Sequence, residues 1–396
     1  MALLSLAGSG PAMRIVCLTS DASTNSLVRL VPVAKVLARN HEVTVAGFMS
    51  GPGVFGQYAD DFDFHTLRTR NLPAFVRQVG SLARSVDADL IYAFKPLSTS
   101  LWTGLAASRR LAVPLALDIE DWEVGWYLDQ PRLDQVKHLA HIERPNGLLW
   151  SIINERLAAF AQHRFVVSRF FQQRFGGTLL SHGPDTTVFD PERWDRQEAL
   201  EEFGLEDLQY VLFAGTPMRS KGVEDVLAAL ERLGRRDTKM LIVGSTRHDP
   251  RFCAELEARH EEILVMLGPQ PHHLMPALLS AATVVALPQR VTHETVGQVP
   301  GKVYEAMAMA RPVVATAVSD LPEILDGCGV VIPPGDSAVL ETSLAQLLDD
   351  AELCHQVGRR ARLRCQERYG WDAMEAILES AFGATVASVS GAGLVE

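Results

Sequence analysis

The chain has 396 residues, of which 47% are hydrophobic and 21% charged, and its formal net charge is −11. This length is too great for one hydrophobic core and predicts two domains with a cleft between them. The negative charge excludes a broad nucleic-acid surface, which needs a basic stripe to displace counterions. No apolar run reaches the roughly 18–20 residues of a membrane span, since Arg109 and Arg110 interrupt the stretch 102–117. The cysteines form no CxxC pair, so we expect neither a zinc site nor disulfides, and a cytoplasmic location.

The first half has the pattern of a parallel sheet. After residues 1–12, expected to be a disordered leader, short Val-, Ile- and Leu-rich runs alternate with helical periods, which is typical of strands joined by crossover helices. We predict a doubly wound, Rossmann-like domain over 13–185. Its strands are expected at 14–20, 41–48, 88–94, 113–119 and 163–168, and its helices at 27–39, 73–86 and 100–111.

The second half repeats the pattern after a linker at 181–195, where Gly, Pro and Asp cluster. A second Rossmann-like domain is predicted over 186–370, and helical sequence continues from 351 to about 382. Residues 384–396 are expected to form a flexible tail. The strands of this domain are expected at 209–215, 239–244, 262–267, 283–288, 311–316 and 329–334.

A cationic turn follows the predicted strand 209–215. The segment FAGTPMRSKG, residues 213–222, places Arg219 and Lys221 before a helix. Ligands of open parallel sheets bind beyond the carboxyl ends of the strands. Helix-start amides and two cations can stabilise a diphosphate whose bond to a sugar is breaking, without a metal. The alternative is that both cations are solvated surface residues.

A second motif, GQVPGKVYEAMAMARPVVAT, covers residues 297–316, with Pro300 as the expected first residue of a short helix. Glu305 lies near the start of that helix. A carboxylate there can accept hydrogen bonds from both hydroxyls of a ribose, while the free amides before it face phosphates or sugar. Alternatively, Glu305 forms an i, i+3 pair with Lys302.

At these motifs the sequence resembles the donor-binding domain of glycosyltransferase family 4, retaining enzymes of GT-B fold. GTPMRSKG is similar to the family's G-x-x-R-x-x-K-G turn, VYEAMAMARPVVAT to its E-A-M-A-x-G-x-P-V-V-A-T helix and strand, and GVVIPPGD to its V-P-P-G-D segment. The resemblance runs from about residue 13 to 382. It implies an α/β GT-B fold, in which 13–185 bind the acceptor, 186–370 bind a nucleotide-sugar, and a helix at 371–383 crosses back to the first domain.

The resemblance implies that Arg219 and Lys221 hold the diphosphate and Glu305 the ribose. A GDP- or UDP-sugar is the expected donor, with no further cofactor and no metal. The family's first glutamate falls at Gly297, which leaves the sugar contacts open, and Arg311 replaces a frequent glycine. The other residues expected to contact the donor are Gly215, Thr216, Gly244, Gly297, Gln298, Val299, Pro300 and Lys302.

Polar residues after strands of the first domain are the candidate acceptor site. The resemblance places Glu120 and Asp121 where relatives carry a His-Asp pair, so we predict that they act near the anomeric carbon. Such an acidic group would suit an amino-bearing acceptor. Alternatively, Asn25 or Ser26 caps a helix, and Lys95 pairs with the acids. The remaining acceptor candidates are Asp21, Asn25, Lys95, Asp118 and Trp122.

Three functions remain open: a retaining transferase for a small-molecule, glycan or lipid-linked acceptor, a GT-B epimerase or cyclitol-coupling pseudo-glycosyltransferase, and a non-catalytic sugar-nucleotide-binding protein. Segment 119–148 is either a functional loop or a helical excursion. We expect a monomer or homodimer without integral membrane contact. Peripheral docking through Arg68, Arg70, Arg77 and Arg84 is disfavoured but testable.

Overall fold

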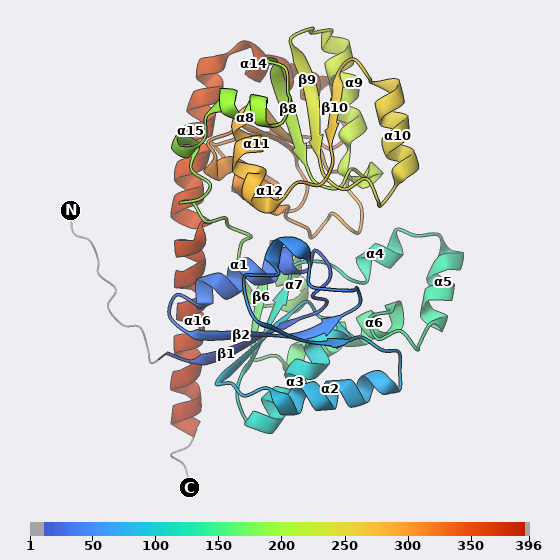
Figure 1. Ribbon diagram of the computed structural model, residues 1–396, viewed down its shortest axis with the longest axis vertical. Helices are drawn as coiled ribbons and strands as arrows, with labels where there is room; N and C mark the ends of the chain where they lie inside the picture. The colour runs from blue at the N-terminus through green and yellow to red at the C-terminus, as the bar shows by residue number, and fades with distance from the viewer. Residues whose placement is uncertain (1–11, 393–396) are drawn as a thin grey trace, which may run out of the picture. The chain divides into compact units, whose positions relative to one another are not determined.

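The computed structural model describes residues 12–392, and their side chains as far as residue 383. Contacts divide the described chain into two compact units. The first unit contains residues 12–167, 171–180 and those from 374 onward, and the second contains 168–170 and 181–373. Each unit has a parallel sheet with helices on both faces (Figure 1), as the sequence predicts. Residues 1–11 of the expected leader lie outside the described residues.

The sheet of the first unit has seven strands in the order β3-β2-β1-β4-β5-β6-β7. All neighbours are parallel, and the order reverses between β1 and β4, which are therefore the strands of the topological switch point. The strands are β1 Arg14–Thr19, β2 Glu42–Met49, β3 Phe64–Arg68, β4 Leu90–Phe94, β5 Leu115–Ile119, β6 His163–Val166 and β7 Thr178–Leu179. The helices between them are α1 Leu27–Leu37, α2 Ala74–Ser85, α3 Thr103–Leu111, α4 Gly125–Leu128, α5 Arg132–Ala140, α6 Leu148–Leu157 and α7 Arg169–Phe175.

The sheet of the second unit has six parallel strands in the order β10-β9-β8-β11-β12-β13, with its switch point between β8 and β11. All six predicted strands are present. They are β8 Gln209–Ala214, β9 Thr238–Val243, β10 Leu264–Leu267, β11 Val284–Leu287, β12 Val313–Thr316 and β13 Val330–Ile332. The helices are α8 Arg196–Glu202, α9 Val223–Leu233, α10 Pro250–Arg259, α11 Met275–Ala281, α12 Gly301–Ala308, α13 Leu321–Ile324, α14 Ser337–Asp349 and α15 Ala351–Arg368.

Strand β8 shows why these runs are almost continuously apolar. Tyr210 and Leu212 enter one hydrophobic cluster, and Val211 and Phe213 enter another. Successive side chains of a strand point to opposite faces, so a sheet covered by helices on both sides needs apolar residues at every position.

The last helix, α16, runs from Trp371 to Ala392, and its residues from Met374 onward belong to the first unit. Phe382 packs edge-on against Tyr92 and Phe165, with ring centroids 6.2 and 5.8 Å apart. The chain therefore returns to the first unit, as the resemblance implied. The prediction of a flexible tail from residue 384 differs from the structure, which is helical to Ala392, because that stretch has no proline to stop propagation.

Segment 119–148 is a helical excursion made of α4 and α5. No residue of α5 is buried, and its Leu133 and Val136 are 74% and 66% exposed. The helical alternative is therefore the one that the structure shows. Within residues 12–392, no helix has the length and apolar character needed to cross a membrane.

Candidate functional site

The cationic turn of the second unit lies at the carboxyl end of β8. Residues Arg219–Lys221 form a short 3₁₀ turn, and Gly222 follows with a φ of 69°. A Cβ atom on Gly222 would lie 2.0 Å from the Pro288 carbonyl oxygen, so only glycine allows the turn to pack against the loop after β11. The Arg290 amide donates to the Ser220 carbonyl at 2.8 Å and fixes the same approach.

Lys221 contacts the loop that precedes α12. Its Nζ donates to Gln298 Oε1 and lies 3.4 Å from Glu294 Oε1. Ser220 Oγ donates to Glu294 Oε2 at 3.2 Å. The two segments follow β8 and β11, so this group lies at the carboxyl side of the switch point, where parallel sheets bind ligands. Glu294 therefore takes part in the site.

Arg219 points to different partners. Its guanidinium lies 3.1 Å from Glu224, 3.3 Å from Glu255 and 4.5 Å from the centroid of the Phe252 ring, and its side chain is 58% exposed. The structure therefore brings Lys221 to the loop before α12, whereas it places Arg219 against α9 and α10.

Glu305 is buried on α12 between two nitrogen groups. Lys302 Nζ donates to its two oxygens at 2.9 and 3.1 Å, as the i, i+3 alternative predicted, and His272 Nε2 lies 3.1 Å from Oε1. Burial alone would raise the pKa of Glu305, but the charge of Lys302 and the hydrogen bond of His272 outweigh burial and lower the pKa to about 2. No sequence signal marked His272, because it comes from the loop after β10.

The remaining donor candidates lie on the same loops. Pro300 is the N-cap of α12, one residue before the helix, because the helix begins at Gly301. Gly244 follows β9, and a Cβ there would lie 2.0 Å from the carbonyl oxygen of Gly215, which follows β8, so this close approach needs glycine at residue 244. The Gln298 amide donates to the Thr295 carbonyl at 3.2 Å, so the expectation of a free amide fails at this position.

Thr216 follows Gly215, and Gly297 precedes Gln298 in the loop before α12. Val299 is 2% exposed, so its side chain belongs to the core, and the expected ligand contact of its amide stays a prediction.

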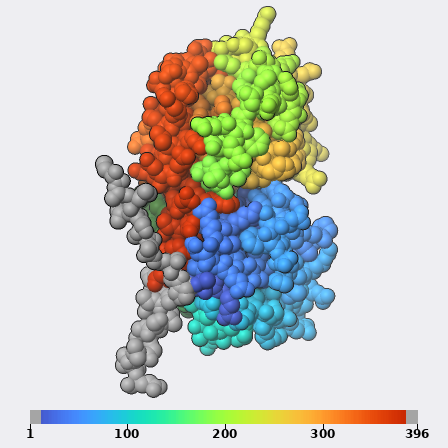
Figure 2. Space-filling model, turned by 60° about the vertical axis from the view of Figure 1, so that its left-hand side comes forward, coloured from blue at the N-terminus to red at the C-terminus, as the bar shows by residue number. Residues whose placement is uncertain are grey.

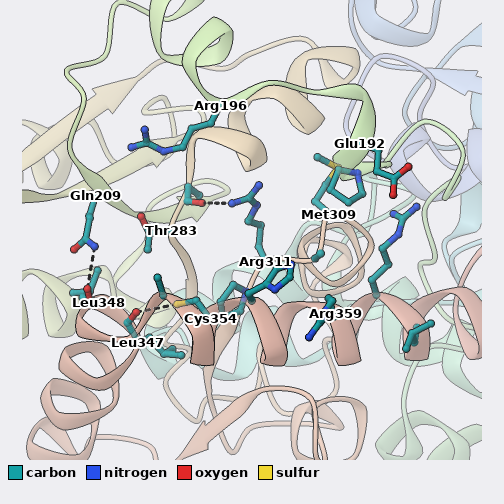
Figure 3. A pocket seen from close by; sticks show the side chains of 18 of the residues that line it. Glu192, Arg196, Gln209, Thr283, Met309, Arg311, Leu347, Leu348, Cys354 and Arg359 are labelled. Carbon is teal, nitrogen blue, oxygen red and sulfur yellow. Dashed lines mark hydrogen bonds between the residues drawn. The ribbon is translucent and has the colours of Figure 1, made fainter.

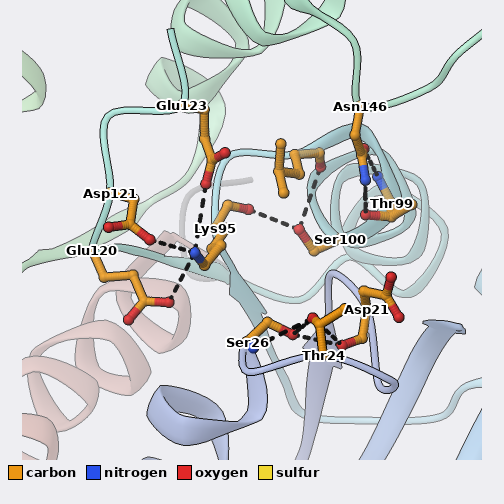
Figure 4. A network of polar contacts seen from close by, with 11 residues as sticks. Asp21, Thr24, Ser26, Lys95, Thr99, Ser100, Glu120, Asp121, Glu123 and Asn146 are labelled. Atoms are coloured by element: carbon orange, nitrogen blue, oxygen red, sulfur yellow. Dashed lines mark hydrogen bonds and ion pairs between the residues drawn. The ribbon is translucent and has the colours of Figure 1, made fainter. Parts of the chain in front are cut away.

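The first unit gathers charges around Lys95, which follows β4 (Figure 4). Its Nζ donates to Asp121 and lies 3.3 Å from Glu120 and 3.7 Å from Glu123. The acids follow β5, the neighbour of β4, so both strands deliver these residues to one edge of the sheet. The predicted ion pair is confirmed, and Glu123, which the sequence analysis did not select, belongs to the same cluster.

This Lys95 cluster places three carboxylates around one ammonium group. Burial raises the pKa of Glu120 to about 7 against the attraction of Lys95, and Asp121 raises it further. Burial also raises the pKa of Glu123. The shared lysine does not compensate all three acids, so near neutral pH this cluster favours an added positive charge.

Asp118 does not bind an acceptor, because it is fully buried. Arg29 Nε and Nη2 donate to its two oxygens at 3.2 and 3.0 Å, and the Tyr92 hydroxyl donates to Oδ2 at 2.9 Å. Arg29 Nη2 also donates to the Leu180 carbonyl at 3.0 Å. This prediction is wrong because both faces of β5 are covered, and the side chain of Asp118 lies in the protein interior.

Asp21 organises the loops after β1 and β2. Its Oδ1 accepts from the Ser23 amide at 2.9 Å and from the Ser50 amide at 3.1 Å. Ser26 is the N-cap of α1, but its hydroxyl donates to the Asp21 carbonyl at 2.6 Å and makes no capping bond. Asn25 is exposed.

Trp122 lies in a packed group beside the Lys95 cluster. Its Nε1 donates to Glu155 at 2.7 Å, and the Arg174 guanidinium lies 4.7 Å from its ring centroid. Across the part of the chain that the structure describes, no group of three or more His, Cys, Asp or Glu residues is arranged to hold a metal ion.

Comparison with known proteins places these motifs in a family. Residues 209–350, which include Lys221 and Glu305, match the family model described as glycosyl transferases group 1. The GDP-mannose-dependent alpha-(1-6)-phosphatidylinositol monomannoside mannosyltransferase of Mycolicibacterium smegmatis is 30% identical over 293 residues, which are 69% of this chain and 73% of that protein. This chain belongs to the glycosyltransferases of GT-B fold, of the family 4 type.

The glycosyltransferase is also 25% identical over 340 residues to the 2-deoxystreptamine N-acetyl-D-glucosaminyltransferase of Streptomyces fradiae, over 81% of this chain and 77% of that protein. Anabaena HepE, crystallised with UDP-glucose, has a TM-score of 0.73 at 18% identity, covering 94% of this chain and all of that one, a likeness that shows the fold. The glycosyltransferase spans about half the length of two other curated relatives, 43% and 53%.

Proposed function

We propose that this glycosyltransferase moves a sugar from a nucleoside diphosphate sugar to a small-molecule, glycan or lipid-linked acceptor, with retention at the anomeric carbon. The contact between Lys221 and Gln298 is the observation that carries the proposal. It places an ammonium group at the switch point, beside the loop that leads to Glu305. A diphosphate at Lys221 would have its ribose within reach of the helix that begins beside that loop.

Glu305 is suited to hold the ribose because its charge is fixed. A pKa of about 2 keeps the carboxylate ionised at neutral pH, and the burial of its side chain strengthens any hydrogen bond it accepts. His272 and Lys302 hold the carboxylate in one position, so its oxygens are pre-positioned for the two hydroxyls.

Arg219 completes the diphosphate site by exchanging partners. Its bonds to Glu224 and Glu255 lie near the surface, where ion pairs contribute little free energy. A diphosphate offers the guanidinium a bidentate partner. As the bond from the anomeric carbon to the phosphate oxygen breaks, the acceptor atom bonds to the same face of that carbon. The acceptor proton passes to the leaving phosphate, and Lys221 and Arg219 stabilise the charge of the diphosphate.

The acceptor is proposed to carry an amino group. The Lys95 cluster has more carboxylates than cations, and an ammonium group would offset that excess. The Streptomyces relative named for 2-deoxystreptamine supports an amine-bearing acceptor class. Glu120 and Asp121 would then orient the acceptor, and Lys95 would hold them in position.

Donor binding is tested by thermal shift with GDP-, UDP-, dTDP- and ADP-sugars. A ligand at one hundred times its dissociation constant adds about 2.7 kcal/mol to the stability of its target. We expect one donor to raise the melting temperature and Lys221→Ala to abolish that shift. The matched control is Lys239→Ala, which removes a lysine paired with Glu206 at 2.8 Å on the surface of the same unit. If no sugar nucleotide shifts the wild type, or if both variants respond alike, the donor proposal is wrong.

Transfer is tested with the donor that binds, using amino-cyclitol and neutral cyclitol acceptors in the presence of EDTA. We expect a mass increase of one glycosyl residue on the amino acceptor, with the donor's anomeric configuration in the NMR spectrum of the product. Inversion would contradict the retaining mechanism, and loss of activity in EDTA would contradict metal independence. Epimerised donor without a new product would favour the epimerase alternative, and equal use of both acceptors would contradict the amine preference.

A further inference from the structure

A cavity lies at the edge of the second unit's sheet where the strands begin, opposite the edge that carries the proposed diphosphate site. It has a volume of about 680 Å³ and is lined by residues from the amino ends of strands, including Gln209, Thr283 and Pro312. Lys221 follows the carboxyl end of β8, whose six residues separate the two edges by roughly 20 Å. The cavity is therefore distinct from the proposed diphosphate site, and its size is within the range of small-molecule sites.

Three segments far apart in the sequence form the walls. They are the stretch from Pro191 to Arg196, the residues 309–312 that follow α12, and the end of α14 with one face of α15. Figure 2 shows the green α8 region beside the red surface of α14 and α15, and Figure 1 shows the same adjacency. Met309, Leu347 and Leu348 contribute apolar surface to the lining (Figure 3).

The charge of the lining is predominantly positive. Arg196 pairs with Asp207 and Arg362 with Asp190, at 2.7 and 2.8 Å. Arg311 and Arg359 also line the cavity, whereas Glu192 is the single acidic residue among the described residues that line it. Arg196 and Arg362 are neutralised by these pairs. The remaining charges of the lining are the guanidinium groups of Arg311 and Arg359 and the carboxylate of Glu192.

Arg311 is the group that most needs a partner. Its Nη1 donates to the Ala282 carbonyl at 3.0 Å, but its Nε is buried and finds no hydrogen-bond acceptor among the described residues. Burial lowers the pKa of Arg311, and the like charge of Arg196 lowers it further. Figure 3 shows Arg311 between Arg196 and Arg359 in this view. A buried donor on an uncompensated cation is costly to leave unsatisfied, which indicates an anion. Residue 311 is also the position at which the sequence departs from the glycine common in the family.

We propose that this cavity binds a small molecule with a phosphate monoester on an apolar or ring-shaped body. The phosphate accepts hydrogen bonds from the guanidinium groups of Arg311 and Arg359, and its two negative charges offset both of them. The body of the ligand packs against Met309 and Leu348. Because Arg362 on the wall also donates to the carbonyl of Ala308, the last residue of α12, the site adjoins the helix that carries Glu305.

The probe is phenyl phosphate, titrated calorimetrically into the 396-residue chain, with phenol as the uncharged control. We expect phenyl phosphate to bind and phenol not to bind, and added salt to weaken the binding. Arg311→Met should weaken binding at least about tenfold, because it removes a charge-assisted hydrogen bond that is shielded from water. Arg359→Met should weaken binding only a few-fold, because its hydrogen bond is exposed. Arg359 is exposed, so its variant keeps the test valid if Arg311→Met fails to fold.

Two further variants distinguish binding in this cavity from binding at a neighbouring arginine or at the proposed diphosphate site. Arg360→Met removes an arginine of α15 that donates to the Gly327 carbonyl and does not line the cavity, so it should bind phenyl phosphate like the wild type. Lys221→Ala should also keep this binding, whatever its effect on sugar nucleotides. The inference would be overturned if the wild type did not bind phenyl phosphate, or if Arg311→Met and Arg359→Met both bound it as tightly as the wild type. Loss of binding in Lys221→Ala would also overturn it.

Discussion

Glu305 of the second unit is buried and Glu120 of the first unit is largely buried, and their surroundings shift the pKa values of the two carboxylates in opposite directions. Glu305 has Lys302 and His272 to itself, and its pKa falls to about 2. Glu120 shares Lys95 with Asp121 and Glu123, and its pKa rises to about 7. Burial raises the pKa in both places, so the number of cations available to each acid decides the sign.

The difference separates two tasks. A fixed negative charge suits recognition of neutral hydroxyl groups, because their hydrogen bonds then go to an ionised acceptor. Acids that are partly protonated near neutral pH instead attract a further cation, whose arrival lowers their pKa. The comparison therefore supports the proposal that the second unit recognises hydroxyl groups and the first unit an amino group.

Removing the fixed charge should have the largest effect. Glu305→Gln leaves Lys302 and His272 in place but replaces the ionised acceptor with a neutral amide. We expect the dissociation constant of the bound nucleoside diphosphate to rise about 10- to 100-fold, because hydrogen bonds to charged groups contribute about 1.5–3 kcal/mol. Isothermal titration calorimetry measures this change.

The control for that experiment is Glu341→Gln, which removes an acid of the same unit that pairs with Arg232. Its affinity should match the wild type. An unchanged affinity in Glu305→Gln would show that the carboxylate stabilises α12 and does not hold the ligand.

All strands of the second sheet and the inner strands of the first could be predicted from sequence, but the two edge strands of the first sheet could not. The predicted strands correspond to all six strands of the second unit and to β1, β2, β4, β5 and β6 of the first. The two strands that the sequence analysis missed, β3 and β7, are the edges of the seven-stranded sheet. An edge strand has fewer buried positions, so β3 carries the polar residues His65 and Thr66, and β7 has only two residues. Neither contains the apolar run that marks a strand buried on both faces.

The site residues also divide into those that could be predicted from the sequence and those that could not. Lys221 could be predicted because it lies on a cationic turn that follows a strand, and Glu305 because it lies near the start of a helix within a motif that resembles the family's. His272 and Arg29 were missed because they come from loops or helices remote in the sequence, and tertiary packing alone brings them to their acids. Asp118 was predicted to bind the acceptor because it lies with Glu120 and Asp121 near a strand end, but it is still inside β5, where every residue is buried, and the sequence pattern does not reveal which way its side chain points.

Removing Lys95, the cation that Glu120 shares with two other acids, tests the side of the comparison that concerns the first unit. Lys95→Met leaves three carboxylates without their ammonium group, so their ionisation should destabilise the first unit as the pH rises. We expect the melting temperature to fall by about 5–10 °C at pH 8 and by less at pH 5, where protonation removes the repulsion. Lys137→Met is the control, because Lys137 forms an exposed pair with Asp134 and should change the melting temperature little at either pH. Equal losses at pH 5 and pH 8 would mean that Lys95 acts through packing.

The smallest effect should come from Glu120 itself. Its pKa in the folded protein is about 7, above the ordinary 4.5, so the folded state favours the protonated form. The corresponding stability is fully present below about pH 4.5 and is lost as the pH rises through 7. Glu120→Gln mimics the protonated form and should flatten the fall in melting temperature between pH 5 and 8, with a gain of about 2–4 °C at pH 8. Glu42→Gln, an exposed position on β2, should keep the wild-type slope. A wild-type slope in Glu120→Gln would mean that Lys95 already compensates this carboxylate, and the contrast with Glu305 would then be one of burial rather than of charge.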